Sequence, residues 1–166
     1  MARPPRSPRA GAFNKEFAAD AIIYGLFMGI PPLVTFVVVV YGFGDGNLGI
    51  NCNENLNSTC TTVYKARAAV FASLTIIILI HAFEMKDTRL SIFRMNLVEN
   101  RTLLYSVLGG CLALFPTIYV PKLNEVLFKM MDITWEWGLC VASVLCYLVG
   151  TESYKACKRR LLEREK

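Results

Sequence analysis

The chain contains four long apolar stretches separated by polar segments. They cover residues 21–41, 68–83, 103–119 and 133–150. Each is close to the roughly 20 residues that a helix needs to cross about 30 Å of hydrocarbon. The two shorter stretches can be extended by flanking residues such as Lys65 and Arg67, whose long side chains reach the headgroups. The pattern predicts four transmembrane helices in an antiparallel bundle.

A soluble four-helix bundle is the alternative to this interpretation. Its helices would carry polar stripes, whereas residues 68–83 and 103–119 are apolar nearly all round. The composition also favours the bilayer, because 54% of the residues are hydrophobic and the mean hydropathy is +0.41. We therefore predict an all-α membrane protein, located in the plasma membrane or an endomembrane.

The basic residues are distributed unevenly along the chain, which has a net charge of +5. Of its 18 Lys and Arg residues, four precede the first stretch, four follow the second and six lie in residues 151–166, against four in the two remaining connections. This bias places both termini in the cytosol. The tail should contact anionic lipid rather than nucleic acid, for which we find no binding module, through Lys155, Lys158, Arg159, Arg160 and Arg164. No secretory signal peptide precedes the first stretch, which lacks a small-residue cleavage site.

The connection formed by residues 42–64 carries the features of a non-cytosolic loop. Asn57-Ser58-Thr59 matches a glycosylation acceptor, and Cys52 and Cys60 flank it. An oxidising compartment would join these cysteines in a disulfide, although two free thiols are the alternative. The other cysteines show no paired metal-ligand spacing, so we predict no metal site; they are Cys111, Cys140, Cys146 and Cys157.

Pro31 and Pro32 interrupt the first stretch and remove two backbone donors. They predict either a packing kink or a break whose free carbonyls coordinate a cation. Trp135 and Trp137 flank Glu136 at the outer start of the last stretch. Indole rings gather at headgroup level, so these two side chains predict an aromatic belt.

His81 and Glu84 stand at the end of the second stretch. Ionisable groups inside a membrane usually face the interior of a bundle, so this pair could line a polar pathway or relay protons. The alternative is that both side chains lie at the cytosolic interface, which we favour for Glu84.

A series of short motifs occurs in the order seen at the C-terminal end of one family of membrane pumps. The chain opens with Met1-Ala2-Arg3-Pro4-Pro5-Arg6, and His81-Ala82-Phe83 ends the second stretch. Val120-Pro121-Lys122-Leu123-Asn124 and Leu127-Phe128-Lys129 precede Trp135, and Gly150-Thr151-Glu152-Ser153-Tyr154-Lys155 precedes the basic tail. In their order and spacing these motifs resemble type II P-type cation ATPases, from the loop before their seventh transmembrane helix to the C-terminus.

The resemblance implies a cytosolic arm at residues 1–20, the last four pump helices at 21–150 and a basic cytosolic tail at 151–166. These pumps couple ATP hydrolysis to cation movement through an aspartyl-phosphate, and their last four helices brace the transport core. The chain has no Asp-Lys-Thr-Gly-Thr, Thr-Gly-Glu-Ser or Gly-rich phosphate motif, and an isolated carboxylate cannot supply phosphoryl transfer. We therefore expect no catalytic residue, metal ligand or cofactor in this chain, while ATP and Mg²⁺ are implied for a full-length pump.

The resemblance also bears on the transported ion. When His81 is set at the polar position near the end of the eighth pump helix, Ile78 takes the place where calcium pumps carry a carboxylate. Isoleucine cannot ligate a hard cation. The run at residues 80–84 instead resembles the fungal sodium-efflux branch, whose members export sodium or potassium. Met1 falls within a motif of the full pump, so we expect a truncated gene, an incompletely defined gene or a late internal start.

Three functions follow as hypotheses. The first is a membrane part of a P-type cation pump, whose partners are the bilayer and the missing pump helices. The second is a stand-alone four-helix protein that associates with a full-length P-type ATPase. The third is a small dimeric proton-coupled transporter, which would need a central membrane-embedded acid. Asp20 and Glu84 both lie near predicted helix ends, which disfavours the third hypothesis.

The predicted topology can be tested by glycosylation. Asn57→Gln should remove any glycan, whereas Asn100→Gln should change nothing, because Asn100-Arg101-Thr102 is expected on the cytosolic side. The measurement is a glycosidase-sensitive mobility shift in a eukaryotic host. Loss of the glycan only in the Asn100 variant would invert the topology.

Overall fold

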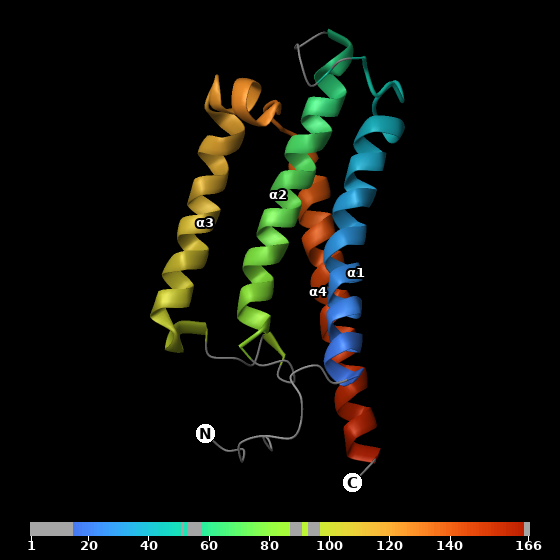
Figure 1. Ribbon diagram of the computed structural model, residues 1–166, viewed down its shortest axis with the longest axis vertical. Helices are drawn as coiled ribbons and strands as arrows, with labels where there is room; N and C mark the ends of the chain where they lie inside the picture. The colour runs from blue at the N-terminus through green and yellow to red at the C-terminus, as the bar shows by residue number, and fades with distance from the viewer. Residues whose placement is uncertain (1–14, 51, 53–57, 87–90, 93–96, 165–166) are drawn as a thin grey trace.

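The part of the chain that the structure describes forms four long helices, which alternate in direction (Figure 1). The computed structural model describes residues 15–50, 52, 58–86, 91–92 and 97–164. The helices are α1 (Lys15–Val37), α2 (Thr61–Glu84), α3 (Arg101–Tyr119) and α4 (Glu136–Arg164). In this part of the chain no strand is present. The first turn of α1 and the last turn of α4 lie at the same end of the bundle (Figure 1), and the prediction of an antiparallel all-α fold is confirmed.

Short helical turns complete the connections between these helices. A π-helical turn, η1 (Val38–Gly42), continues α1, and a 3₁₀ turn, η2 (Ser58–Cys60), leads into α2. A second 3₁₀ turn, η4 (Leu97–Glu99), precedes α3, and a second π-helical turn, η5 (Leu123–Phe128), follows it. The start of α3 is capped by the side chain of Asn100, whose Oδ1 accepts a hydrogen bond from the backbone N–H of Leu103 at 3.2 Å.

Among the described residues, three helical segments are long and apolar enough to cross a membrane. They are Phe17–Gly42, which joins α1 to η1, then α2 and α3. These agree with three of the four predicted spans. The fourth helix, α4, is long enough to cross, since 29 residues rise by about 43 Å in an α-helix. Its polar residues make it less hydrophobic than the other three segments. Its role as a span therefore stays a prediction.

The bounds of α4 differ from those expected from the sequence. The last apolar stretch was expected to begin at residue 133 and to end at Gly150. The helix instead begins at Glu136 and continues through the basic segment to Arg164. Ile133 precedes the helix because its buried side chain packs in the core while its carbonyl accepts a hydrogen bond from the Tyr119 hydroxyl at 2.8 Å.

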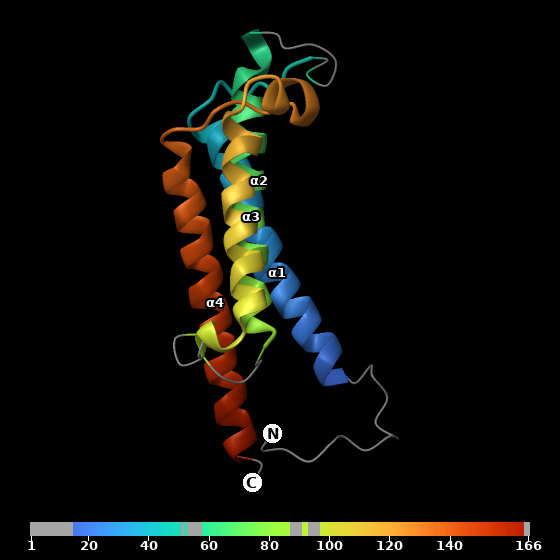
Figure 2. The ribbon, with the colours of Figure 1, turned by 90° about the vertical axis from the view of Figure 1, so that its left-hand side faces the viewer.

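The helix α2 is the centre of the bundle, because it packs against each of the other three. Its buried face is built mainly from small side chains, which let neighbouring backbones approach closely: Ala66, Ala68, Ala69, Ala72 and Ser73. In the main core cluster, Ala68, Ala69 and Ala72 pack with side chains from α3, from α4 and from the segment between them: Leu114, Ile118, Met130, Ile133 and Cys140. The views show α3 beside α2 and the early part of α1 slanting away from α4 (Figures 1 and 2).

Large apolar side chains cover the outside of the bundle. Examples from each helix are Ile22, Leu33, Ile78, Leu112, Leu145 and Val149, all substantially exposed. In water such a surface would be an aggregation hazard, whereas hydrocarbon solvates it. The arrangement is therefore that of a membrane protein.

The loop between α1 and α2 is closed by a disulfide between Cys52 and Cys60, whose Cα atoms are 5.5 Å apart. The Tyr64 hydroxyl donates to the Cys52 carbonyl at 2.5 Å and ties the loop to α2. Gly49 has a φ of +69° and lies so close to both sulfur atoms that a Cβ would collide with them. The predicted glycosylation residue Asn57 lies outside the described residues.

Gly150 permits close contact between α4 and α1. A Cβ built at this position would lie 2.6 Å from two ring atoms of Phe27. Gly150→Ala should therefore lower the free energy of unfolding by about 1–3 kcal/mol, as overpacking does elsewhere. The measurement is denaturant unfolding in mixed micelles.

Gly138→Ala on the same helix is the matched control, because a Cβ there meets nothing within 4 Å. Alanine should leave stability unchanged or raise it slightly through its higher helix propensity. Equal losses in the two variants would contradict the packing role of Gly150.

Candidate functional site

The buried face of α4 is polar along almost its whole length. Its positions recur every three or four residues, which places them on one side of a helix. They are Glu136, Cys140, Ser143, Tyr147, Thr151 and Lys155, all buried. The apolar residues of α4, such as Leu145 and Val149, face outward. This helix therefore presents its polar groups to its neighbours rather than to the surroundings.

The main polar cluster gathers around Glu84 at the end of α2. Its carboxylate is only 1% exposed and accepts hydrogen bonds from two side chains of α4. The Tyr147 hydroxyl donates to Oε2 at 2.5 Å, and the Thr151 hydroxyl donates to Oε1 at 3.0 Å. Such charge-assisted bonds satisfy a carboxylate that would otherwise be costly to bury.

Lys155 supplies the compensating charge. Its Nζ lies 3.3 Å from Oε1 of Glu84 and 3.9 Å from Oε1 of Glu152, and its side chain is fully buried. Among the described residues Nζ has no hydrogen-bond partner, so proximity and opposite charge hold the pair together. The expectation that Lys155 contacts lipid headgroups is wrong, because the helix turns this side chain toward α2. Glu84 likewise lies inside the bundle rather than in solvent.

His81 also belongs to the cluster. A count of the available protons shows that its Nδ1 donates a hydrogen bond. Tyr147 has one hydroxyl proton, which it donates to Glu84. Nδ1 of His81 lies 2.8 Å from the same hydroxyl oxygen. Since that oxygen has no second proton to give, Nδ1 must be the donor. The order of donation is therefore His81 to Tyr147 to Glu84.

A second polar layer ties α1 to the same part of α4. Asp20 accepts from the Tyr154 hydroxyl and from Nζ of Lys158, each at 2.6 Å. The ring of Tyr24 lies between the layers, 5.2 Å from the His81 ring and 5.8 Å from the Tyr154 ring, measured between centroids. Lys158 thus also departs from the expected lipid contact, since its charge is paired within the bundle.

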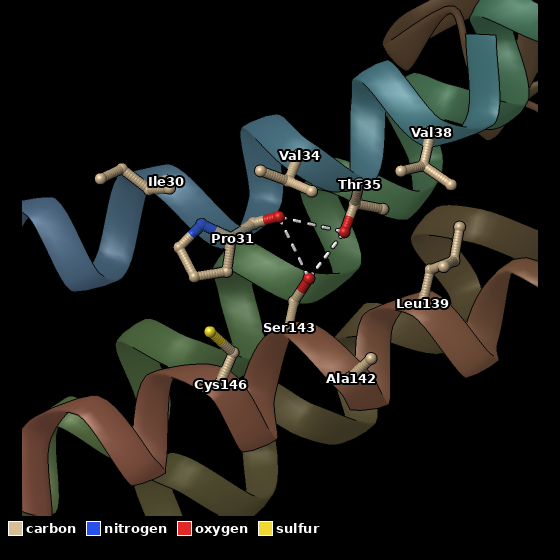
Figure 3. Close-up of a pocket in the computed structure, with 9 residues that line it drawn as sticks. All are labelled: Ile30, Pro31, Val34, Thr35, Val38, Leu139, Ala142, Ser143 and Cys146. Atoms are coloured by element: carbon tan, nitrogen blue, oxygen red, sulfur yellow. Dashed lines mark hydrogen bonds between the residues drawn. The ribbon is translucent and has the colours of Figure 1, made fainter. Parts of the chain in front are cut away.

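The paired prolines lie in a continuous α1, and Pro31 faces α4 (Figure 3). The Pro31 carbonyl lies 3.2 Å from the hydroxyls of both Thr35 and Ser143, and these hydroxyls are 2.6 Å apart. Two hydroxyl protons can fill only two of these three contacts at once. The three oxygens satisfy one another across the α1–α4 contact, which favours the packing interpretation over cation coordination.

The chain matches the family described as "Cation transporting ATPase, C-terminus" over residues 1–157. It belongs to this family. The suspected membership is therefore confirmed, and the four-helix bundle corresponds to the C-terminal membrane region of cation-transporting ATPases.

The relatives of this chain include sodium/potassium exporters. It is 38% identical to the sodium/potassium exporting P-type ATPase cta3 of Schizosaccharomyces pombe, over all of this chain and 18% of that protein. It is 34% identical to the sodium/potassium exporting P-type ATPase 1 of Saccharomyces cerevisiae, over all of this chain and 16% of that protein. The calcium-transporting ATPase of Bacillus subtilis is 26% identical over 85% of this chain and 14% of its own length. The chain thus spans less than a fifth of these relatives.

Glu152 and Lys155, in the motif that precedes the basic tail, both contact other parts of the bundle. Oε1 of Glu152 accepts the backbone N–H of Ile92 at 2.9 Å and so fastens the α2–α3 connection to α4. Lys155 reaches the Glu84 carboxylate. The motif was visible in the sequence, but its partners were not. The recurrence of Ser143, Tyr147, Thr151 and Lys155 at intervals of four was the available signal for a polar helix face.

The opposite end of the bundle carries the predicted aromatic residues. Trp135 is exposed, and Nε1 of Trp137 donates to the Tyr119 hydroxyl at 2.7 Å. Glu136 between them is buried, accepts the Thr134 N–H at 2.8 Å and lies 3.9 Å from Nζ of Lys65. This arrangement fits an aromatic belt, with the intervening carboxylate turned inward.

Outside the spans, Lys86 and Glu99 form an ion pair at 2.6 Å that links the two ends of the α2–α3 connection. The hydrogen bond from Lys86, together with its charge, lowers the pKa of Glu99 below its usual value. Glu99 therefore stays ionised at neutral pH. The pair is exposed, so it positions the connection rather than stabilising the bundle.

The buried pair can be tested with a double-mutant cycle. Glu84→Gln leaves the Lys155 ammonium without its partner, and Lys155→Met leaves the carboxylate without its compensating charge. Each single variant should lose about 3–5 kcal/mol of unfolding free energy. The double variant should be more stable than either single variant. The measurement is unfolding in mixed micelles.

Arg160→Met is the control on the same helix, because Arg160 is exposed; it should change stability little. A double variant whose loss equals the sum of the two single losses would show that Glu84 and Lys155 do not act as a pair.

Proposed function

We propose that this chain is the C-terminal membrane part of a P-type pump that exports sodium or potassium, and that it supports transport without being catalytic alone. The observation that carries the proposal is the identity of 38% to a sodium/potassium exporter over the full length of the chain. The calcium-transporting relative is less similar, at 26%. Ile78, where a calcium ligand would be expected, agrees with this preference because its side chain has no oxygen.

The buried network supports a bracing role. Glu84 is engaged by Tyr147, Thr151 and Lys155, and Asp20 is engaged by Tyr154 and Lys158. Carboxylates held by hydrogen-bond donors and cations are poorly placed to ligate a transported ion. They do join α1, α2 and α4 into one unit. A rigid unit of this kind suits a support against which the transporting helices of a pump move.

The proposal includes a membrane topology. We infer that α4 is the fourth span and that both ends of the chain face the cytosol, as the distribution of basic residues favours. The Cys52–Cys60 disulfide and the acceptor at Asn57 would then face an oxidising compartment. ATP and Mg²⁺ would act in the remainder of the pump, which is also the partner that this chain requires.

A chimera provides the test. The corresponding C-terminal segment of the Schizosaccharomyces pombe exporter would be replaced by this chain, and the product expressed in yeast cells that lack sodium exporters. The chimera should restore growth in high sodium and lower cellular sodium. The chain expressed alone should restore neither and should hydrolyse no ATP.

A matched chimera carrying the segment of the Bacillus subtilis calcium-transporting ATPase is the control and should restore less growth. If the chain's chimera reaches the membrane but exports no sodium or potassium, the proposal fails. If instead the separate chain co-purifies with an intact pump and changes its activity, it is an associated protein rather than a pump segment.

A further inference from the structure

A recess between α1 and α2 reaches the polar cluster from outside. Its volume is about 280 Å³, and its walls include Tyr24, Gly25, Met28 and Met85, with Asp20 and His81 as polar lining residues. This is ample for several water molecules, since one needs only about 10–15 Å³ of such space. The lining is mostly apolar, and the polar atoms available to water in it belong to Asp20, Tyr24 and His81.

His81 connects the recess to the cluster. Its Nδ1 is committed to the Tyr147 hydroxyl, as the proton count above requires. Among the described residues, Nε2 takes part in no hydrogen bond, and the side chain is 18% exposed. In the neutral ring Nε2 is therefore a free acceptor that lines a recess able to hold water.

The far side of His81 is coupled to a buried ion pair. Nδ1 lies 3.6 Å from Oε2 of Glu84, and Nζ of Lys155 lies 3.3 Å from the other carboxylate oxygen. A proton gained at Nε2 would place a second cation beside a carboxylate that Lys155 already neutralises. Imidazolium and ammonium would then share Glu84, at distances where charges interact strongly in a bundle interior.

We propose that Nε2 of His81 is a proton-binding site, supplied through the α1–α2 recess and coupled through Tyr147 and Glu84 to Lys155. The other ionisable groups around it are Asp20 and Tyr24 on α1, and Glu152, Tyr154 and Lys158 on α4. The proton enters and leaves as a solvent proton, and no other bond changes. This site is a property of the bundle itself and does not depend on the proposed export function.

The chain has a single histidine, so nitrogen NMR of histidine-labelled chain in lipid nanodiscs reports on His81 alone. At high pH the spectrum should show a protonated Nδ1 and a bare Nε2. Acidification should shift the Nε2 resonance to the protonated position and leave Nδ1 protonated. A neutral ring with its hydrogen on Nε2, or a ring that binds no proton while the bundle stays folded, would overturn the proposal.

Tyr147→Phe tests the coupling, because it keeps the ring and removes the acceptor of the Nδ1 hydrogen. The neutral imidazole of this variant should lose its preference for Nδ1–H, and Nε2–H should appear. Tyr105→Phe, on the exposed face of α3, should leave the spectrum unchanged. A folded Tyr147→Phe chain with an unaltered Nδ1–H signal would contradict the assigned coupling.

Gly25→Val tests the route, since Gly25 lines the recess and a larger side chain there would fill part of it. Gly29→Val is its control, one turn along α1; a Cβ at either glycine meets nothing within 4 Å, and Gly29 does not line the recess. Exchange of the Nε2 proton with water should slow in Gly25→Val only. Equal exchange in the two folded variants would overturn the recess as the route.

Discussion

The ion pair between Glu84 and Lys155 is the interaction on which the bundle depends most. Both side chains are buried at the same end of the molecule, one on α2 and the other on α4. In hydrocarbon neither charge can be left alone, because desolvation of an unpaired ion exceeds any packing gain. The position of α4 against α2 is therefore held by electrostatics as well as by van der Waals contact. Tyr147 and Thr151 each donate a hydrogen bond to one oxygen of the carboxylate and give the contact its register.

The helices α2 and α4 pack against their neighbours in different ways. A row of small side chains on α2 allows close approach, since apolar helices in lipid gain little from burying more apolar surface. A row of polar side chains on α4 offers hydrogen bonds that lipid cannot provide. Pro31 of α1 joins this second arrangement, because its carbonyl lies between the hydroxyls of Thr35 and Ser143. Large apolar side chains still cover much of the outer surface of the helices.

A rigid unit and a proton site are compatible in one network. The carboxylate of Glu84 is fully engaged, which suits a brace within a cation pump. His81 stands between this carboxylate and the recess between α1 and α2. The same hydrogen bonds that fix α4 against α2 would then transmit a change of charge at the imidazole to Lys155. The same contacts would then both hold the helices together and couple proton binding at His81 to Lys155.

The sequence by itself determined the helical membrane fold, the family and the places of most helices, because hydropathy and motif order are local properties. It also indicated His81 and Glu84 as unusual groups. Only the tertiary structure decided that Lys155 is buried rather than lipid-facing, and that α4 extends to Arg164. A basic residue that follows an apolar stretch is normally predicted to be an interfacial anchor. Whether it is buried depends on how far the helix extends and on which side faces the neighbouring helix. The partner of a buried charge lies on another helix, so no local pattern can reveal it.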